Sequence, residues 1–366
     1  MMFFRIFFIF LLLVALGSPL TAKAEPISIV AVGDLLLGGS ATKRIKQSGF
    51  SYPFAATGDY LRQADIAMAN LEAPLTDAKE PTPDKKYTFK VSPKAAAEFK
   101  QAGFDLMTLA NNHIGDFGQQ GVLDTLEALT EAGLGFAGAG KNLQQAREPY
   151  VIEVDGAKLA FLAYSNTFPK SFYAKKRKPG TAFGNFDHVA TDTRNARKLA
   201  DYVIVSFHWG AELMAEPKDY QQELGRVAID NGAQVVIGHH PHILQGAEIY
   251  KDGVIYYSLG NYAFGSYSRN AVTAGMARVW LENGKLVKAE ILPLNILNVD
   301  VHFQPKPLSH GPAYLFARNF IAACEPLNTT LRKQPDLFWR IEKIKLAGEG
   351  QGQVRHQGTK DTKESL

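Results

Sequence analysis

The feature that most constrains the fold is a series of short apolar segments that each end at a polar residue. Five segments with strand-forming composition end in this way: 27–32 before Asp34, 66–70 before Glu72, 106–109 before Asn112 and His113, 202–207 before His208, and 235–237 before His240 and His242. Helical patterns separate several of these segments, as in the helix expected from Pro93 to Ala102. Alternating strands and helices predict an α/β fold. Because ligands bind at the carboxyl ends of strands in such sheets, we expect these polar residues to converge.

The composition indicates a globular chain and excludes several classes of protein. Of 366 residues, 46% are hydrophobic and 21% are charged, which excludes disordered and collagen-like chains. The single cysteine, Cys324, cannot form an internal disulfide or a Cys-rich zinc site. The net charge of +4 and the lack of a basic aromatic surface argue against nucleic acid as a partner. Neither a glycine-rich dinucleotide motif nor a P-loop is present, so no nucleotide-cofactor site is expected.

The first 24 residues predict a secretory signal peptide. Arg5 precedes an apolar run at 6–16, and Ala22-Lys23-Ala24 provides a cleavage site with small residues. The run is shorter than the ~20 residues that span a bilayer, which disfavours the alternative of an uncleaved membrane anchor. Cleavage would leave 342 residues with a net charge of +2. We therefore expect a protein of the periplasm or the extracellular space that contacts the membrane only transiently, through this segment.

The remaining chain is expected to form one unit over residues 25–346, with a C-terminal extension from about residue 295. Two β-hairpins are predicted around the turns Asp155-Gly156 and Asn283-Gly284. Residues 347–366 are polar and rich in Gly, Gln and Lys, so a disordered tail is expected there. A basic segment at 170–178 does not fit the strand and helix pattern.

The polar residues after the strands are of the types that bind divalent cations. Carboxylate, amide oxygen and imidazole groups suit manganese, zinc and iron, and a shared carboxylate from Asp34 or Glu72 would allow two ions. Each residue also has a structural alternative, such as a cap at Asp34, a solvated carboxylate at Glu72 or a buried core histidine at His208. Three of the nine histidines fall within residues 239–242, and this clustering favours metal binding.

Six motifs occur in a fixed order along the chain. They are Gly33-Asp34, Asn70-Leu71-Glu72, Asn111-Asn112-His113 with Asp116 and Gly118, His208-Trp209-Gly210 with Glu212, His240-Pro241-His242 with Gly238 and Gln245, and Tyr257-Ser258-Leu259-Gly260-Asn261. Together they resemble the bacterial capsule synthesis (CapA, poly-γ-glutamate) family, which is similar to the calcineurin-like metallophosphoesterases. The resemblance covers about residues 27–293.

The resemblance implies a fold and a set of residue roles. The fold would be a four-layer α/β/β/α sandwich with a centre for one or two divalent ions (Mn, Zn or Fe) at the strand ends. The implied metal ligands are Asp34, Glu72 as the bridging carboxylate, Asn112, His208, His240 and His242. The implied catalytic group is His113, as general acid or transition-state stabiliser, with Asp116, Glu212 and Asn261 as supporting or substrate-binding groups. His239 lies outside the family pattern and is given no role.

The first strand departs from the metallophosphoesterase pattern. These enzymes carry Asp-x-His at this strand, whereas Asp34 is followed by Leu35 and Leu36. In addition, Glu72 stands where the superfamily has a bridging aspartate. We therefore expect one ion to bind more tightly than the other.

Two hypotheses for function follow. The first is an exported metal-dependent hydrolase of capsule or poly-γ-glutamate metabolism that uses a metal-activated water on a phosphoester or an anionic polymer. The alternative is a non-catalytic component of capsule assembly or export that binds the polyanion through the basic residues of 170–178. Capsule synthesis or export proteins are the expected partners in either case. The simplest interpretation of 170–178 itself is a solvated, disordered loop.

Overall fold

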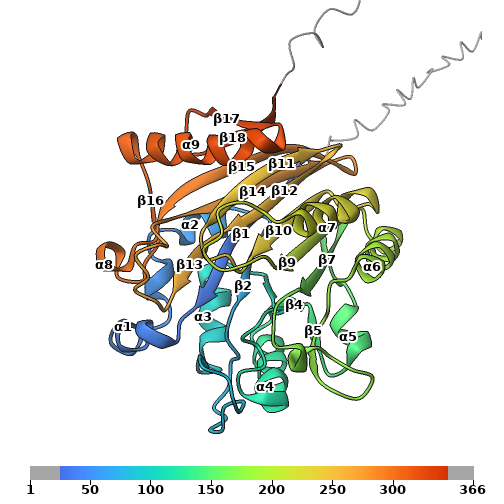
Figure 1. Cartoon of the computed structure of the whole chain (residues 1–366), viewed down its shortest axis with the longest axis vertical. Helices are drawn as coiled ribbons and strands as arrows, with labels where there is room; N and C mark the ends of the chain where they lie inside the picture. Colours follow the sequence, from blue (N-terminus) through green and yellow to red (C-terminus); the bar gives the residue numbers. More distant parts are fainter. Residues whose placement is uncertain (1–24, 345–366) are drawn as a thin grey trace, which may run out of the picture.

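The computed structural model describes residues 25–344. The predicted signal peptide at 1–24 and the predicted tail at 347–366 lie outside the described residues. Two β-sheets lie face to face, with helices on their outer sides (Figure 1). No helix within residues 25–344 has the length and apolar character needed to cross a lipid bilayer.

The larger sheet has ten strands. They are β1 (Ile27–Leu36), β2 (Ile66–Leu71), β3 (Leu106–Thr108), β4 (Gly135–Ala137), β13 (Asn261–Phe264), β14 (Thr273–Glu282), β15 (Lys285–Asn295), β16 (Lys306–Pro307), β17 (Thr329–Lys333) and β18 (Trp339–Lys343). Their order is β17-β18-β15-β14-β1-β2-β3-β4, with β13 paired to β1 and β16 to β15. The run from β1 to β4 is parallel, so these strands bring their carboxyl ends to one edge.

The smaller sheet has six strands. They are β6 (Tyr150–Val154), β7 (Ala157–Ser165), β9 (Tyr202–His208), β10 (Val235–His239), β11 (Leu244–Tyr250) and β12 (Gly253–Leu259). Their order is β11-β12-β10-β9-β7-β6, and the four strands β12, β10, β9 and β7 are parallel. Two short strands, β5 (Ala139–Gly140) and β8 (Gly180–Thr181), pair separately.

Three buried apolar clusters separate the layers. One lies between the large sheet and the helices α1 (Thr42–Ser48), α2 (Gly58–Arg62), α3 (Ala95–Ala102) and α4 (Gly118–Glu131). A second fills the space between the two sheets. The third lies between the small sheet and the helices α5 (Leu143–Arg147), α6 (Phe186–Leu199) and α7 (Asp219–Asp230). This arrangement confirms the predicted α/β fold and its four-layer α/β/β/α sandwich.

Alternation along each strand decides which side chains reach the space between the sheets. In β9, Val203 and Val205 pack on the helices, whereas Ile204 packs between the sheets. Because side chains alternate with a period of two, His208 at the end of β9 belongs to the inter-sheet face. The same alternation places Asn70 of β2 on the inter-sheet face, since Met68, two residues earlier, packs between the sheets.

Helix α6 and strand β13 are not predicted from the sequence, and each has a physical reason. Helix α6 is largely polar, and only Val189, Thr193 and Ala196 of its residues are buried. Three buried residues at helical spacing give only a weak periodic pattern of hydrophobicity. Strand β13 has four residues and forms by pairing with β1, which no local pattern indicates.

Residues after Asn295 add to both the large sheet and the core. They form α8 (Asn298–Val301), β16, α9 (His310–Cys324), β17 and β18. Helix α9, at the top of Figure 1, inserts Phe316, Phe320 and Cys324 into the inter-sheet cluster. The buried Cys324 thiol accepts a hydrogen bond from the backbone N–H of Ala247 in β11.

The basic segment 170–178 is folded, so the expectation of a disordered loop is wrong. It begins with a 3₁₀ turn, Lys170–Phe172, and Lys175 and Lys178 pair across a tight turn. Phe172 is buried against Gly115, where a Cβ atom would lie 2.7 Å from its ring. The Lys178 ammonium donates to the Ser171 carbonyl. Four of the five basic side chains in the segment remain exposed: Lys170, Lys175, Lys176 and Arg177.

Candidate metal centre

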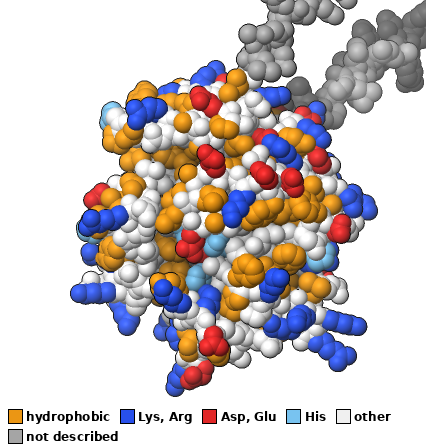
Figure 2. Space-filling model, in the orientation of Figure 1, with side chains coloured by type: hydrophobic (Ala, Val, Ile, Leu, Met, Phe, Trp, Pro, Cys, Tyr) orange, Lys and Arg blue, Asp and Glu red, His pale blue; other side chains and the backbone are white. Residues whose placement is uncertain are grey.

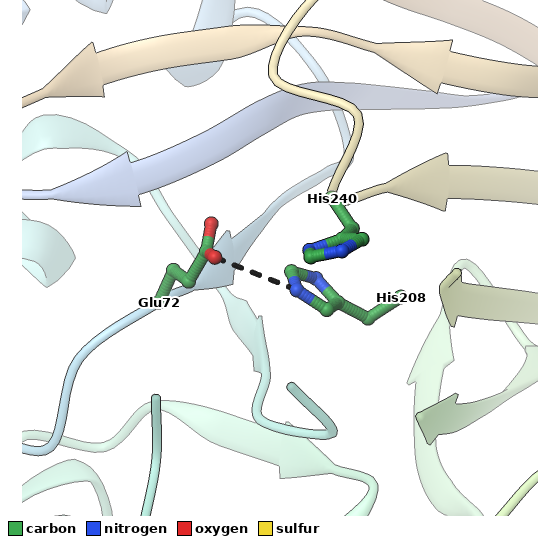
Figure 3. A group of neighbouring side chains, drawn as sticks. All are labelled: Glu72, His208 and His240. Carbon is green, nitrogen blue, oxygen red and sulfur yellow. Dashed lines mark ion pairs between the residues drawn. The ribbon is translucent and has the colours of Figure 1, made fainter. Parts of the chain in front are cut away.

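The predicted polar residues converge where the parallel strands of the two sheets end. Asp34 lies in β1 and Glu72 directly follows β2 in the large sheet. His208 ends β9, and His240 follows β10 in the small sheet. Figure 3 shows the Glu72 carboxylate directed at the rings of His208 and His240, which lie next to each other with centroids 4.7 Å apart. The two sheets thus contribute donors to one site, as the sequence predicts.

A backbone irregularity turns Asp34 toward this site. Val30 and Val32 of β1 face the helices, and simple alternation would place Asp34 on the same side. The pairing of β1 with β2 shifts register between Ala31 and Asp34, which re-aims the side chain. Gly33 permits the close approach of the chain that follows β12, since a Cβ atom there would lie 1.8 Å from the Gly260 oxygen.

Two groups of three donors share Glu72. Glu72, His208 and His240 form one group, and Asp34, Glu72 and His242 form the other, with donor atoms of each group within 4.8 Å of one another. The Glu72 Oε1 atom lies 3.4 Å from His208 Nε2 and 3.8 Å from His242 Nε2. Glu72 is therefore the carboxylate that both groups of donors have in common.

The Glu72 carboxylate is buried without a hydrogen-bond partner in the described chain, which indicates the kind of ligand that the site could bind. The side chain is fully buried, and neither oxygen has a hydrogen-bond partner among the described residues. His240 Nδ1 likewise lacks one. Buried polar atoms are nearly always satisfied, so these atoms require a partner that the described residues do not supply. A set of carboxylate and imidazole donors fits a divalent transition metal ion.

Amide side chains complete the surroundings of both groups. Asn112 Oδ1 lies 2.8 Å from His208 Nε2, at the edge of the first group. Asn261 Oδ1 lies 2.9 Å from His242 Nδ1, whose ring also approaches Asp34 Oδ2 at 3.3 Å. Asn112 thus lies beside the first group of donors, which the sequence predicts it to join. Asn261 contacts His242 of the second group without belonging to that group.

The electrostatics of the cluster match a cation site. Burial, together with the nearby Asp34 charge, raises the pKa of Glu72 well above its usual range. Burial lowers the pKa of His208 well below its ordinary value, and burial with the His242 charge lowers the pKa of His240 to about 3. Both imidazoles are therefore neutral at pH 7, which is the form that binds a metal ion.

Asp34 and His242 form an ion pair in the same cluster. Burial alone would raise the pKa of Asp34, but the His239 and His242 rings, each with Nδ1 3.3 Å from a carboxylate oxygen, hold it well below its usual range. Burial would lower the pKa of His242, but Glu72 and Asp34 raise it to about 10. A cation bound by Asp34 would replace the proton of His242.

His113 and Asp116 form a hydrogen-bonded pair beside the donors. His113 Nδ1 lies 2.8 Å from Asp116 Oδ2, and Asp116 is fully buried. The Lys85 ammonium lies 2.9 Å from the same nitrogen and donates to Asp116 Oδ1. Burial lowers the pKa of His113, and the Asp116 contact opposes this. Since Nδ1 is engaged, Nε2 is the nitrogen that remains to meet a substrate.

Glu212 differs from the other predicted residues in being exposed. It lies near enough for its charge to raise the pKa of Glu72 and of His242. Figure 2 shows histidine side chains at the surface near the middle of one face, beside an acidic side chain and above Lys or Arg side chains. Among the donors themselves, the His242 side chain is 14% exposed, whereas Asp34 and Glu72 are fully buried.

Four residues at the site were not assigned from the sequence: Asn70, Lys85, Asn111 and His239. Asn70 Nδ2 donates to Asp34 Oδ1 at 2.8 Å, and Asn111 Nδ2 donates to Asn70 Oδ1 at 3.1 Å. Asn70 and Asn111 lie within motifs that had been singled out, so alternation along β2 could have indicated Asn70. Lys85 lies in an irregular stretch between β2 and α3, where no pattern indicates its position.

The chain is similar to known proteins of capsule synthesis. The family described as bacterial capsule synthesis protein PGA_cap matches residues 28–266. The capsule biosynthesis protein CapA of Bacillus anthracis is 32% identical over 292 residues, which cover 78% of this chain and 70% of that protein. The PGA biosynthesis protein CapA of Bacillus subtilis (strain 168) is 31% identical over 278 residues, 75% of this chain and 73% of that one.

A solved structure also shows a distant likeness. The NAD nucleotidase of Haemophilus influenzae is 14% identical to this chain, with a TM-score of 0.44, over 81% of this chain and 56% of the nucleotidase. A likeness of this size has no bearing on activity.

Proposed function

The chain belongs to the bacterial capsule synthesis (PGA_cap) family, and we propose that it is an exported metal-dependent hydrolase of capsule or poly-γ-glutamate metabolism. The observation that carries the proposal is Glu72, a fully buried carboxylate without hydrogen-bond partners in the described chain, between two groups of imidazole and carboxylate donors. Asp34, Glu72 and His242 would hold one ion, and Glu72, Asn112, His208 and His240 the other.

The protein side chains supply the rest of the chemistry. Divalent ions held by these donors would polarise the scissile group and lower the pKa of a coordinated water. In its imidazolium form, His113 would keep Nδ1–H on Asp116 and place Nε2–H against the leaving group, to which Nε2 donates a hydrogen bond or its proton. Asp116 holds the ring through Nδ1, and Lys85 balances the charge of Asp116. The substrate would be a phosphoester or an amide of an anionic polymer.

Activity on model substrates tests the proposal. Purified protein loaded with Mn²⁺ or Zn²⁺ is expected to hydrolyse a phosphodiester or a γ-glutamyl substrate, and His113→Ala and His240→Ala are expected to lower kcat by about 10²-fold or more. His310→Gln, on the exposed start of α9, is the matched control. Absence of activity with every metal, or activity unchanged in both variants, would contradict the proposal.

A second candidate function rests on the exposed basic side chains of 170–178. As a non-catalytic component of polymer assembly or export, the chain would bind a polyanion there, alongside capsule synthesis or export proteins. Removal of the five charges from Lys170 to Lys178 would then weaken poly-γ-glutamate binding, and the loss would shrink at high salt. Equal binding by the wild type and the variant at moderate salt would count against this role.

A further inference from the structure

His239 is a buried histidine whose position has no explanation in its own sheet. It ends β10, beside His208 of β9, and is 1% exposed. Neither ring nitrogen has an aligned hydrogen-bond partner among the described residues. Its Nδ1 atom lies 3.3 Å from Asp34 Oδ1 of the other sheet. A buried imidazole without an aligned hydrogen bond requires a reason for its retention.

The contacts of Asp34 divide between its two oxygens. Oδ1 faces Asn70 Nδ2 at 2.8 Å and His239 Nδ1 at 3.3 Å. Oδ2 faces His242 Nδ1 and the backbone N–H of His240, both at 3.3 Å. His239 therefore lies on the side of the carboxylate that is turned away from His242, and it belongs to neither group of donors.

Strand β1 itself offers Asp34 no further support. The residue two positions after Asp34 is Leu36, which is fully buried on the helix side of the sheet. A polar group that holds Asp34 must therefore come from another element. Asn70 supplies one from the same sheet, and His239 is placed to supply the other from the facing sheet.

We propose that His239 is a positioning residue for Asp34. Its Nδ1 atom lies 3.3 Å from Asp34 Oδ1 without being aligned for a hydrogen bond, and a small rotation of the ring lets the Nδ1–H group donate to that oxygen. This contact fixes the rotation of the carboxylate and would direct Oδ2 to a cation held with Glu72 and His242. The inference rests on the proposed function, because it assigns Asp34 to a metal ion. Groups that hydrogen-bond to a ligating carboxylate typically contribute 10- to 100-fold in metal affinity. His239 thereby supports the group of donors that contains Asp34.

Metal titration of matched variants tests this role. The full chain is freed of metal with a chelator and titrated with Mn²⁺, and free Mn²⁺ is counted by its EPR signal. His239→Leu removes the N–H group, whereas His239→Asn keeps an N–H donor bonded to Cγ, at the place of Nδ1. His310→Gln is the control for loss of a histidine far from the site. Thermal unfolding confirms that each variant is folded, and His239→Ala replaces the leucine variant if that one is not.

The expected result is selective. His239→Leu weakens one Mn²⁺ site by roughly 10- to 100-fold and leaves the other unchanged, while His239→Asn and His310→Gln bind as the wild type does. Wild-type affinity at both sites in the leucine variant would overturn the inference and leave the proposed function standing. An asparagine variant as weak as the leucine variant would also overturn it, by showing that the ring itself is needed. A wild-type chain that binds no Mn²⁺ would overturn the proposed function and this inference together.

Discussion

At the scale of single residues, the site is a set of buried charges held by a few specific contacts. Asp116 shows the principle, because this fully buried carboxylate is met by the Lys85 ammonium, the His113 ring and the Phe89 backbone N–H. Each contact offsets part of the cost of removing the carboxylate from water. The stretch that carries Lys85 and Phe89 has no regular secondary structure, so Asp116 fixes it beside His113.

Lys85→Met is expected to destabilise the metal-free protein by about 1–3 kcal/mol, because Asp116 loses its cationic partner. Lys86→Met is the matched control, since Lys86 is exposed and its loss should cost less than about 0.5 kcal/mol. Urea unfolding followed by circular dichroism measures both. Equal free energies of unfolding for the two variants would show that the Lys85 contact contributes nothing.

At the scale of elements, the centre depends on how closely β1 approaches the chain around Gly260. The Asp34 backbone N–H donates to the Gly260 oxygen at 3.0 Å, and Asp34 pairs with Asn261 of β13. The register shift in β1 and the lack of a side chain at Gly33 make this approach possible. A single glycine therefore positions both Asp34 and the segment that carries Asn261.

Gly33→Ala is expected to separate these two segments. The added Cβ atom would meet backbone atoms, which cannot rotate away as a side chain can, so we expect a loss of about 1–3 kcal/mol in stability. Weaker Mn²⁺ binding should accompany it. Gly311→Ala, in α9, places its Cβ atom in open space and should leave both properties unchanged or raise stability slightly. Equal melting temperatures and equal metal affinities in the two variants would contradict this role of Gly33.

At the scale of the whole molecule, the sequence predicted the parts of the fold that local patterns encode. The strands before Asp34, Glu72 and His208 were predicted because they are apolar runs that end abruptly. Helix α6 was missed because few of its residues are buried. The same holds for the site. Its predicted donors lie at the ends of strands, where a local pattern indicates them. The roles of His239 and Lys85 depend on contacts with Asp34 and Asp116, which lie far away in the sequence.

The centre has a consequence for the protein as a whole. Glu72 is desolvated and has no hydrogen-bond partner in the described chain, so its burial is unfavourable without a cation. Ions that bind the folded state only would stabilise it by mass action, by about 2.7 kcal/mol at a concentration 100 times the Kd. Metal binding and folding stability should therefore change together.

The most direct test of the central claim is a metal count on the wild type and on Glu72→Gln. After loading with Mn²⁺ and removal of free ions, the wild type is expected to retain two ions per chain by elemental analysis. Glu72→Gln should lose affinity at both sites, because Glu72 belongs to both groups of donors. Glu131→Gln, at the exposed end of α4, is the control and should bind as the wild type does. A wild type without bound divalent ions, or a Glu72→Gln variant that retains both, would contradict the account.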